Sequence, residues 1–264
     1  MASVREICGF FNENAPFYTK FDFDNIGLLV GDPAQEVHRV LTALDITDAV
    51  IAEASGLGAQ LIVSHHPLIF DPLKAVVADD YKGRKLYRLI REDISAICLH
   101  TNMDTADGGV NDCLMAALGG TVTGLLDPHG AHPDGRPYGV ARLGELPEAM
   151  ELETFLARTK HALGVNMLRY VSGGKPVKRL ACCGGAGGSE IEKALRAGCD
   201  TYVTADLKYD HFLWAKEMGL NLIDADHFCT ENVVVPHLAA LLRGRFPALD
   251  VRISTRHKQT AQVF

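Results

Sequence analysis

The sequence predicts an α/β protein with two α/β lobes, in which mainly parallel sheets are packed by helices. Segments with strand character alternate with segments of helical spacing along most of the 264 residues. The strand segments are also continuously apolar, which is typical of parallel strands covered on both faces. Because parallel strands require crossover connections, this alternation indicates helices layered against sheets.

The first half of the chain contains three pairs of a strand and a helix. One helix has glycines near its end, as is typical of a helix C-terminus. We expect strands at residues 37–47, 60–66 and 94–100, and helices at residues 48–59, 81–93 and 108–120. This series predicts the sheet of the first lobe.

The composition of the sequence changes near Thr121, where a segment rich in Gly and Pro begins. A second series of strands and helices follows it. We expect strands at residues 138–143, 166–172, 177–183, 200–206, 220–226 and 250–256, and helices at residues 150–164, 189–199, 211–219 and 231–246. The predicted boundary lies near Leu126, so residues 1–126 with 232–264 form the first lobe and residues 127–231 form the second.

The composition restricts the class of protein. The net charge of -7 argues against nucleic acid or a membrane surface as a partner. The first residues lack an apolar stretch with a basic flank, so no signal peptide is expected. No apolar run approaches the roughly 20 residues that span a bilayer. The seven cysteines contain no CxxC, which indicates reduced cysteines in a cytoplasmic protein rather than a zinc–thiolate cluster.

Polar residues follow three of the expected strands, at the ends where ligands bind in open parallel sheets. These residues are His65 and His66, the segment 100–104, and the segment 224–231. Each follows an apolar run, so the polar side chains are candidates for function. The second segment contains His100 and Asp104, and the third contains His227 and Glu231.

The two adjacent histidines suggest two metal ions. Successive side chains of a regular strand point to opposite faces, so His65 and His66 cannot readily bind one ion from within a strand. At a strand end beside Pro67 they could bind two different ions. Asp104 and Glu231 could bridge those ions. An accidental pair of histidines is the alternative interpretation.

The type of ligand limits the metal. Imidazole together with carboxylate suits zinc, iron, manganese or nickel, and does not suit calcium. His227 supplies a further nitrogen. His100 could be a ligand or a group hydrogen-bonded to a ligand.

Other polar segments have less specific interpretations. Asp24 and Asn25, in DNIGLLVGD, could cap, bind or turn the chain, and Asp45 could be a further site residue. The loop CCGGAGGSEI could hold an anion on its backbone N–H groups or form a tight turn, and the tight turn is favoured.

Five segments together resemble the family of GTP cyclohydrolase 1 type 2 homologues, which are NGG-interacting-factor-like dinuclear metal proteins. The segments are DNIGLLVGD, VSHHPLIF, HTNMDTADGGVND, CGGAGGSEIEKALRAGCDTYVTADLKYDH and LIDADHFCTE. The resemblance implies a dinuclear metal site in the cleft between two lobes, assembly as a homohexamer, and two divalent ions per chain. It implies metal ligands at five positions: His65, His66, Asp104, His227 and Glu231. It places His100 at or near the metals.

Three positions depart from the family pattern. Ala205 and Asp226 stand where Gly is usual, and Thr230 stands where Ser is usual. Asp226 adds a carboxylate that could alter metal preference or the approach of an anionic substrate.

These observations lead to a hypothesis of a metal-dependent hydrolase. It acts on a nucleotide or a related small molecule through a metal-activated water. Glu231 would bridge the ions, and His211 or Asp226 would transfer protons. The first alternative is a non-enzymatic regulatory or chaperone-like metal-binding protein that acts through protein partners. The second is a structural metal at a subunit contact.

Overall fold

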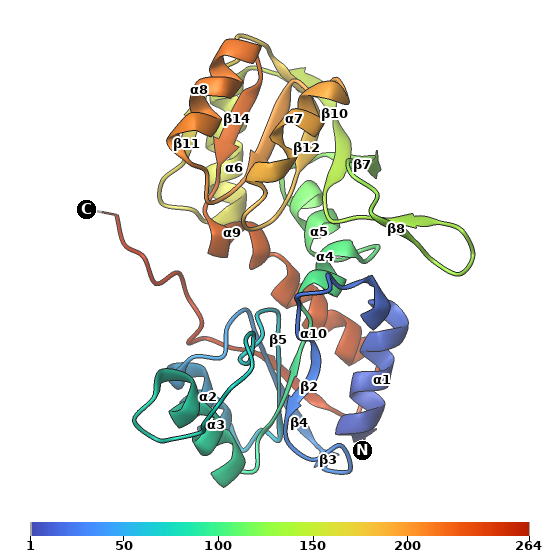
Figure 1. Cartoon of the computed structure of the whole chain (residues 1–264), viewed down its shortest axis with the longest axis vertical. Helices are drawn as coiled ribbons and strands as arrows, with labels where there is room; N and C mark the ends of the chain where they lie inside the picture. The colour runs from blue at the N-terminus through green and yellow to red at the C-terminus, as the bar shows by residue number, and fades with distance from the viewer. Residues whose placement is uncertain (1, 264) are drawn as a thin grey trace. The chain divides into compact units, whose positions relative to one another are not determined.

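The computed structural model describes residues 2–263, which form two compact units (Figure 1). Within these residues, unit 1 comprises residues 2–103 and 235–258, and unit 2 comprises residues 104–234 and 259–263. Each unit is built around its own sheet.

Unit 1 contains a five-stranded sheet. Its order is β15 (Asp250–Ile253), β4 (Arg39–Ala43), β5 (Leu61–Ser64), β6 (Ser95–Cys98) and β2 (Gly27–Val30). The first four strands are parallel, and β2 is antiparallel to β6. Ala43 pairs with Ser64, and Ser64 pairs with Cys98, so β4, β5 and β6 end in line at one edge. Residues that follow these strands therefore start from neighbouring positions.

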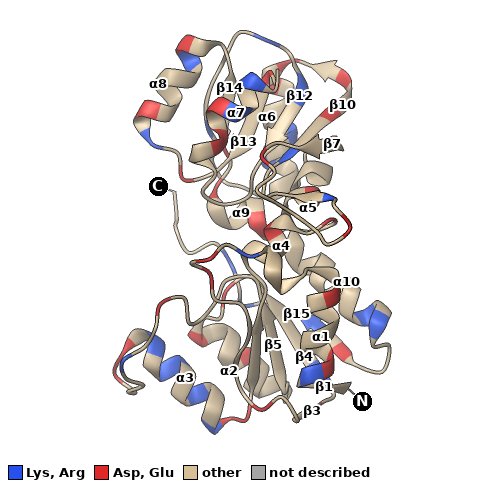
Figure 2. Ribbon diagram, turned by 45° about the vertical axis from the view of Figure 1, so that its right-hand side comes forward, with Lys and Arg blue, Asp and Glu red and all other residues tan. Residues whose placement is uncertain are grey.

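Helices cover both faces of this sheet. The helices α2 (Asp48–Leu57) and α3 (Tyr81–Arg91) lie on one side, and α1 (Val4–Asn14) and α10 (Val234–Arg245) lie on the other (Figures 1 and 2). The side chains of Thr47 and Asp80 cap α2 and α3 by accepting hydrogen bonds from backbone N–H groups of the first turn. The strands β5 and β6 are buried along their whole length, as the continuous apolar pattern predicted.

Unit 2 contains a six-stranded mixed sheet. Its order is β11 (Arg169–Val171), β14 (Asn221–Asp224), β13 (Thr201–Thr204), β12 (Val177–Cys182), β10 (Arg142–Met150) and β7 (Thr121–Leu125). The strands β12, β13 and β14 are parallel, and the other three pair antiparallel with their neighbours. A small hairpin joins β8 (Gly130–Ala131) to β9 (Pro137–Tyr138).

Two separate apolar clusters hold the helices of unit 2 against its sheet. One cluster includes residues of α5 (Val110–Ala117) and α6 (Leu152–Leu163). The other includes residues of α7 (Ile191–Arg196) and α8 (Tyr209–Met218). The remaining elements are short: η1 (Phe17–Thr19), α4 (Thr101–Thr105), η2 (Gly188–Glu190), α9 (His227–Glu231), and the paired β1 (Ala2–Ser3) and β3 (Glu36–Val37).

The predicted fold class is confirmed, because both units are α/β layers with parallel strands at their centres. The sequence patterns predicted none of α1, β2 and β7. The strand expected at residues 138–143 is instead β10, which begins at Arg142. The chain turns before it, where the Arg142 guanidinium donates to the Gly139 carbonyl.

The compact units divide after residues 103 and 234, whereas the sequence suggested lobes divided at residues 126 and 231. The division after 103 follows from the pairing of β7 with β10, which places residues 121–125 in the second sheet. The lobe limits expected from the sequence remain a prediction.

Charged residues of both signs are distributed over the elements (Figure 2). The basic residues of α3 are a local exception, but three of them are paired, and Lys82 lies 3.7 Å from Asp71. Arg84 lies 2.7 Å from Asp48, and Arg88 lies 2.7 Å from Glu92. Among the described residues, no helix is both long and apolar enough to cross a membrane.

Candidate metal centre

Three histidines gather at the carboxyl edge of the unit 1 sheet. His65 and His66 follow β5, and His100 follows β6. Their ring centroids are 5.0 Å (His65–His66), 5.3 Å (His65–His100) and 5.7 Å (His66–His100) apart. One ligand nitrogen from each ring lies within 4.8 Å of those of the other two. Adjacent parallel strands therefore bring together the histidines that the sequence singled out.

Each of these rings is oriented through its Nδ1 atom. Nδ1 of His65 lies 2.8 Å from the carbonyl oxygen of Leu99. Nδ1 of His66 lies 2.7 Å from Oδ1 of Asp45, and Nδ1 of His100 lies 2.8 Å from Oδ1 of Asp24. A carbonyl or carboxylate oxygen accepts the Nδ1 proton, so in the neutral ring Nε2 carries the lone pair. Metal-binding histidines are typically oriented in this way.

Asp24 is the most constrained of these acceptors. Its side chain is fully buried, and Oδ2 accepts hydrogen bonds from the Thr101 backbone at 3.0 Å and the Thr101 hydroxyl at 2.6 Å. Burial alone would raise the pKa of this carboxyl, but the hydrogen bonds from His100 and Thr101 outweigh it and lower the pKa to about 2. Asp24 is therefore an anion that holds His100 and the start of α4. Asn25 instead donates to the carbonyl of Ile69 at 2.7 Å.

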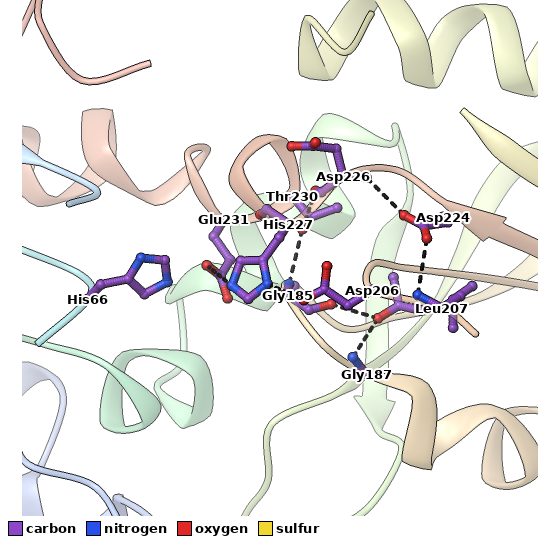
Figure 3. Close-up of polar contacts among 12 residues, drawn as sticks. His66, Gly185, Gly187, Asp206, Leu207, Asp224, Asp226, His227, Thr230 and Glu231 are labelled. Carbon is purple, nitrogen blue, oxygen red and sulfur yellow. Dashed lines mark hydrogen bonds and ion pairs between the residues drawn. The ribbon is translucent and has the colours of Figure 1, made fainter. Parts of the chain in front are cut away.

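The second group of candidate ligands lies in unit 2, on the short helix α9. His227 and Glu231 are four residues apart and share one face of this helix. Nε2 of His227 lies 3.1 Å from Oε2 of Glu231, and Nδ1 lies 2.7 Å from Oδ2 of Asp206 (Figure 3). His227 is therefore oriented by a carboxylate in the same way as His66 and His100.

This environment changes the acidity of His227. The hydrogen bond to Glu231 is the largest cause, and together with Asp206 it outweighs burial and raises the pKa of the imidazole to about 9. In the metal-free protein the ring is thus a cation at neutral pH. A metal ion bound here would take the place of that proton.

Asp104 lies on α4, at the start of unit 2. One of its carboxylate oxygens lies within 4.8 Å of a carboxylate oxygen of Glu231. Two carboxylates at this separation repel each other unless a cation lies near them. The pair is therefore suited to a shared divalent ion.

The loop after β12 packs directly on these ligands. A Cβ atom added to Gly185 would overlap Oε1 of Glu231 and lie 3.1 Å from Nε2 of His227. Gly185 has φ +62°, and its N–H donates to Oγ1 of Thr230 at 3.0 Å (Figure 3). Only glycine meets both requirements at this position. The backbone of the loop CCGGAGGSEI thus lies close to the side chains of the candidate ligands His227 and Glu231.

Asp226 serves as the N-cap of α9. Its Oδ1 accepts a hydrogen bond from the Cys229 N–H at 3.0 Å, and its Oδ2 accepts one from the Gln259 side chain. The backbone φ of Asp226 is +69°, a conformation that favours glycine. This conformation explains why Gly is usual at this position in the family pattern. In this chain the position is Asp, and the N-cap hydrogen bond compensates for the less favourable backbone.

Asp224 also fixes the ligand-bearing segment. Its Oδ2 accepts from the Leu207 N–H at 3.1 Å, and its Oδ1 accepts from the Asp226 N–H at 3.3 Å (Figure 3). It also pairs with Arg169. It therefore connects the segment that carries Asp206 to the start of α9.

His211 lies on α8, where a Cβ atom on Gly188 would be 2.6 Å from Cε1 of its ring. It lines a cavity of about 460 Å³ together with Lys193, Arg196 and Trp214. The proton-transfer roles expected for His211 and Asp226 remain predictions.

The donors fit divalent metals of the expected kind. Unit 1 contains three histidines with Nδ1 oriented by an oxygen acceptor. Unit 2 contains a fourth such histidine beside two carboxylates that lie close together. This combination of imidazole and carboxylate suits zinc, iron, manganese or nickel. The structure thus contains His and Glu groups that could hold a metal ion.

Sequence reasoning missed Asp206 and the role of Gly185. Asp206 follows β13 in TADLKYD, so its place after an apolar strand was an available signal. The only signal for Gly185 was the glycine run itself.

The two α/β sheets and the clustered donors define an α/β protein with candidate metal ligands. A family model described as Duf34/NIF3 (NGG1p interacting factor 3) matches residues 2–260, and the chain belongs to this family. The family predicted from the sequence is thereby confirmed.

Individual relatives agree with this assignment. A Clostridium perfringens protein named GTP cyclohydrolase 1 type 2 homolog is 36% identical over 243 residues, which are 92% of each chain. A Streptomyces coelicolor protein of the same name is 39% identical over 213 residues, covering 79% of this chain and 74% of that one. Among solved structures, a Staphylococcus aureus hypothetical protein has a TM-score of 0.92 at 31% identity over 99% of each chain. A Bacillus cereus protein related to NIF3 has a TM-score of 0.92 at 27% identity, covering 100% of this chain and 99% of that one.

Proposed function

We propose that this protein binds two divalent metal ions and acts as a metal-dependent hydrolase on a nucleotide or a related small molecule. The ligands would be His65, His66, Asp104, His227 and Glu231, with His100 at or near the ions. The observation that carries the proposal is the common orientation of the histidines. In both units an oxygen acceptor fixes Nδ1, as is typical of metal-binding imidazoles.

Different side chains of the proposed site would bind the metal ions and transfer protons. Bound divalent ions supply a water that is nucleophilic at neutral pH and polarise the bond that it attacks. Glu231 would bridge the ions, since it already lies against His227 and near Asp104. Asp24, Asp45 and Asp206 would hold the imidazoles in place. His211 or Asp226 would transfer protons.

The choice of a hydrolase rests on the relatives. Proteins 36% and 39% identical to this chain are named GTP cyclohydrolase 1 type 2 homolog. The name supports a nucleotide as the first substrate to test. We further propose a homohexamer from the family resemblance and a cytoplasmic location from the seven cysteines, which are unpaired in the structure.

The test combines metal content with turnover. Protein purified without chelator should contain about two ions per chain by plasma mass spectrometry, and Glu231→Ala should contain fewer. Glu190→Ala is a matched control, because Glu190 is also buried but pairs with Lys193. Turnover of GTP or another member of a nucleotide panel should disappear in Asp104→Ala.

The alternatives predict other results. A non-enzymatic metal-binding regulatory or chaperone-like protein would retain metal and turn over nothing in the panel. A structural metal would be revealed if chelation dissociated the oligomer and melted the fold together. Absence of metal from the wild type, with no uptake on reconstitution, would refute the proposal.

A further inference from the structure

We infer that Asn111 is a positioning residue that holds Asp104 in register with the loop packed on His227 and Glu231. This inference deepens the proposed metal site and rests on it. Asn111 lies on α5 and is 1% exposed. Its side-chain hydrogen bonds, described below, go to backbone groups and not to the side chain of any candidate ligand. Its effect on metal binding would therefore pass through the backbone.

The amide of Asn111 joins three segments of unit 2. Its Nδ2 donates to the carbonyl of Asp104 at 3.1 Å and to the carbonyl of Val140. Its Oδ1 accepts a hydrogen bond from the N–H of Gly184 at 2.7 Å. A primary amide is the side chain that offers two donors and an acceptor from one planar group. The side-chain amide of Asn111 therefore uses both N–H groups and its oxygen to connect the three segments.

Two of these segments carry or contact candidate ligands. Asp104 is itself a candidate ligand. A Cβ atom on Gly184 would lie 3.2 Å from Cγ of Glu231, and the adjacent Gly185 packs against Glu231 and His227. The Asn111 side chain therefore fixes the backbone of Asp104 relative to the loop that confines Glu231. Loss of this connection should alter the separation of the two carboxylates.

A second buried asparagine provides a matched control. Asn221 lies in unit 2 and is 0% exposed. Its Oδ1 accepts from the Gly173 N–H at 2.8 Å, and its Nδ2 donates to the Lys175 carbonyl at 3.0 Å and to Oγ1 of Thr201 at 3.1 Å. It begins β14, whereas the candidate ligands follow the other end of that strand. Its loss costs the same kinds of hydrogen bond, with partners that are not candidate ligands.

The test is a Co²⁺ titration of metal-free protein, followed by visible absorption, on wild type, Asn111→Ala, Asn111→Asp and Asn221→Ala. Folding of each variant is checked first by circular dichroism. Asn111→Asp keeps the acceptor for Gly184 and the shape of the side chain, but it has no donor for Asp104. We expect both Asn111 variants to bind Co²⁺ about 10–100-fold more weakly, with an altered spectrum, and Asn221→Ala to bind as wild type does.

The outcomes separate this inference from the proposed function. If wild type binds two Co²⁺ ions and either folded Asn111 variant binds them with unchanged affinity and spectrum, the positioning role is refuted and the metal site stands. If Asn221→Ala loses as much affinity as the Asn111 variants, general destabilisation explains the loss and the positioning role is again refuted. If wild type binds no Co²⁺, the proposed function fails and the inference fails with it.

Discussion

Oδ2 of Asp206 lies 2.7 Å from Nδ1 of His227, on the side of the imidazole opposite to the atom that faces Glu231. The carboxylate fixes both the orientation of the ring and the position of its proton. His227, a candidate Nε2 ligand, is thus oriented by a residue 21 positions away in the sequence.

Asp206→Ala should weaken metal binding while leaving the fold intact. The substitution removes the acceptor for Nδ1, so the ring loses its fixed orientation, and metal affinity should fall about 10–100-fold. Isothermal titration with Zn²⁺ measures the change. Asp210→Ala is the control, since Asp210 is exposed and lies at the start of α8. Equal affinities for the two variants would contradict the assigned role of Asp206.

Metal affinity should rise with pH up to about 9. Since the pKa of His227 is raised to about 9, an ion that binds the ring must displace a proton at lower pH. Apparent affinity should therefore increase towards that pKa and then level off. Titrations with Mn²⁺ between pH 6.5 and 9.5 test this. An affinity independent of pH over that range would show that His227 is not a ligand.

The same titration should affect the metal-free protein in the opposite sense. The folded-state pKa of His227 lies above its ordinary value of 6.5, so its protonated form favours folding. That contribution is fully present below pH 6.5 and is lost as pH rises through about 9. Chemical denaturation of metal-free wild type and His227→Gln, compared at pH 6 and pH 9.5, measures it. The stability difference between the two proteins should shrink at the higher pH.

Gly185→Ala should reduce metal binding by displacing Glu231. The added methyl group would overlap the Glu231 carboxylate, and it would also place a non-glycine residue at φ +62°. Gly164→Ala separates the two effects, because Gly164 has φ +64° but open space around its Cα. Metal content by plasma mass spectrometry should fall only in Gly185→Ala. An equal loss in both variants would attribute the effect to backbone strain.

Arg142→Met should destabilise the protein by about 3–5 kcal/mol, because it leaves a buried network without its cation. The Arg142 side chain is 1% exposed, donates to the carbonyls of Gly139, Thr105 and Ala106, and lies 2.9 Å from Asp112. Urea denaturation measures the loss. Arg136→Met, at an exposed arginine paired with Asp134, should leave the midpoint almost unchanged. Similar midpoints for the two variants would contradict the role given to the buried network.

The parts of the site that sequence predicted are those encoded by local pattern. His65, His66 and His100 each follow a continuously apolar strand, and parallel pairing brings such strand ends together. His227 and Glu231 follow another expected strand, and the structure places both on one face of the short helix α9, which the sequence did not predict. The position of polar residues after apolar strands was therefore sufficient to single out these candidate ligands.

The residues that orient the candidate ligands could not be predicted in this way. Asp24 is 76 positions from His100, and their contact depends on how the N-terminal segment crosses the end of the sheet. Asn111 was part of a matched segment, but its bond to Gly184 spans 73 positions. Such pairings arise from tertiary packing, which one sequence does not reveal.

The elements missed in the fold have more local explanations. The helix α1 begins with a capping box between Ser3 and Glu6, so a start signal was present. The strand β2 is bounded by Gly27 and Gly31, which resembled a loop. The strand β7 is an edge strand with exposed side chains, so it lacks the apolar run that marked the central strands.

A crystal structure of metal-loaded protein, with anomalous diffraction data collected at the absorption edge of the bound metal, would test the proposed metal centre most directly. We expect two anomalous peaks per chain, coordinated by His65, His66, Asp104, His227 and Glu231. Peaks that contact none of these side chains, or no peak in crystals of protein shown to contain metal, would contradict it.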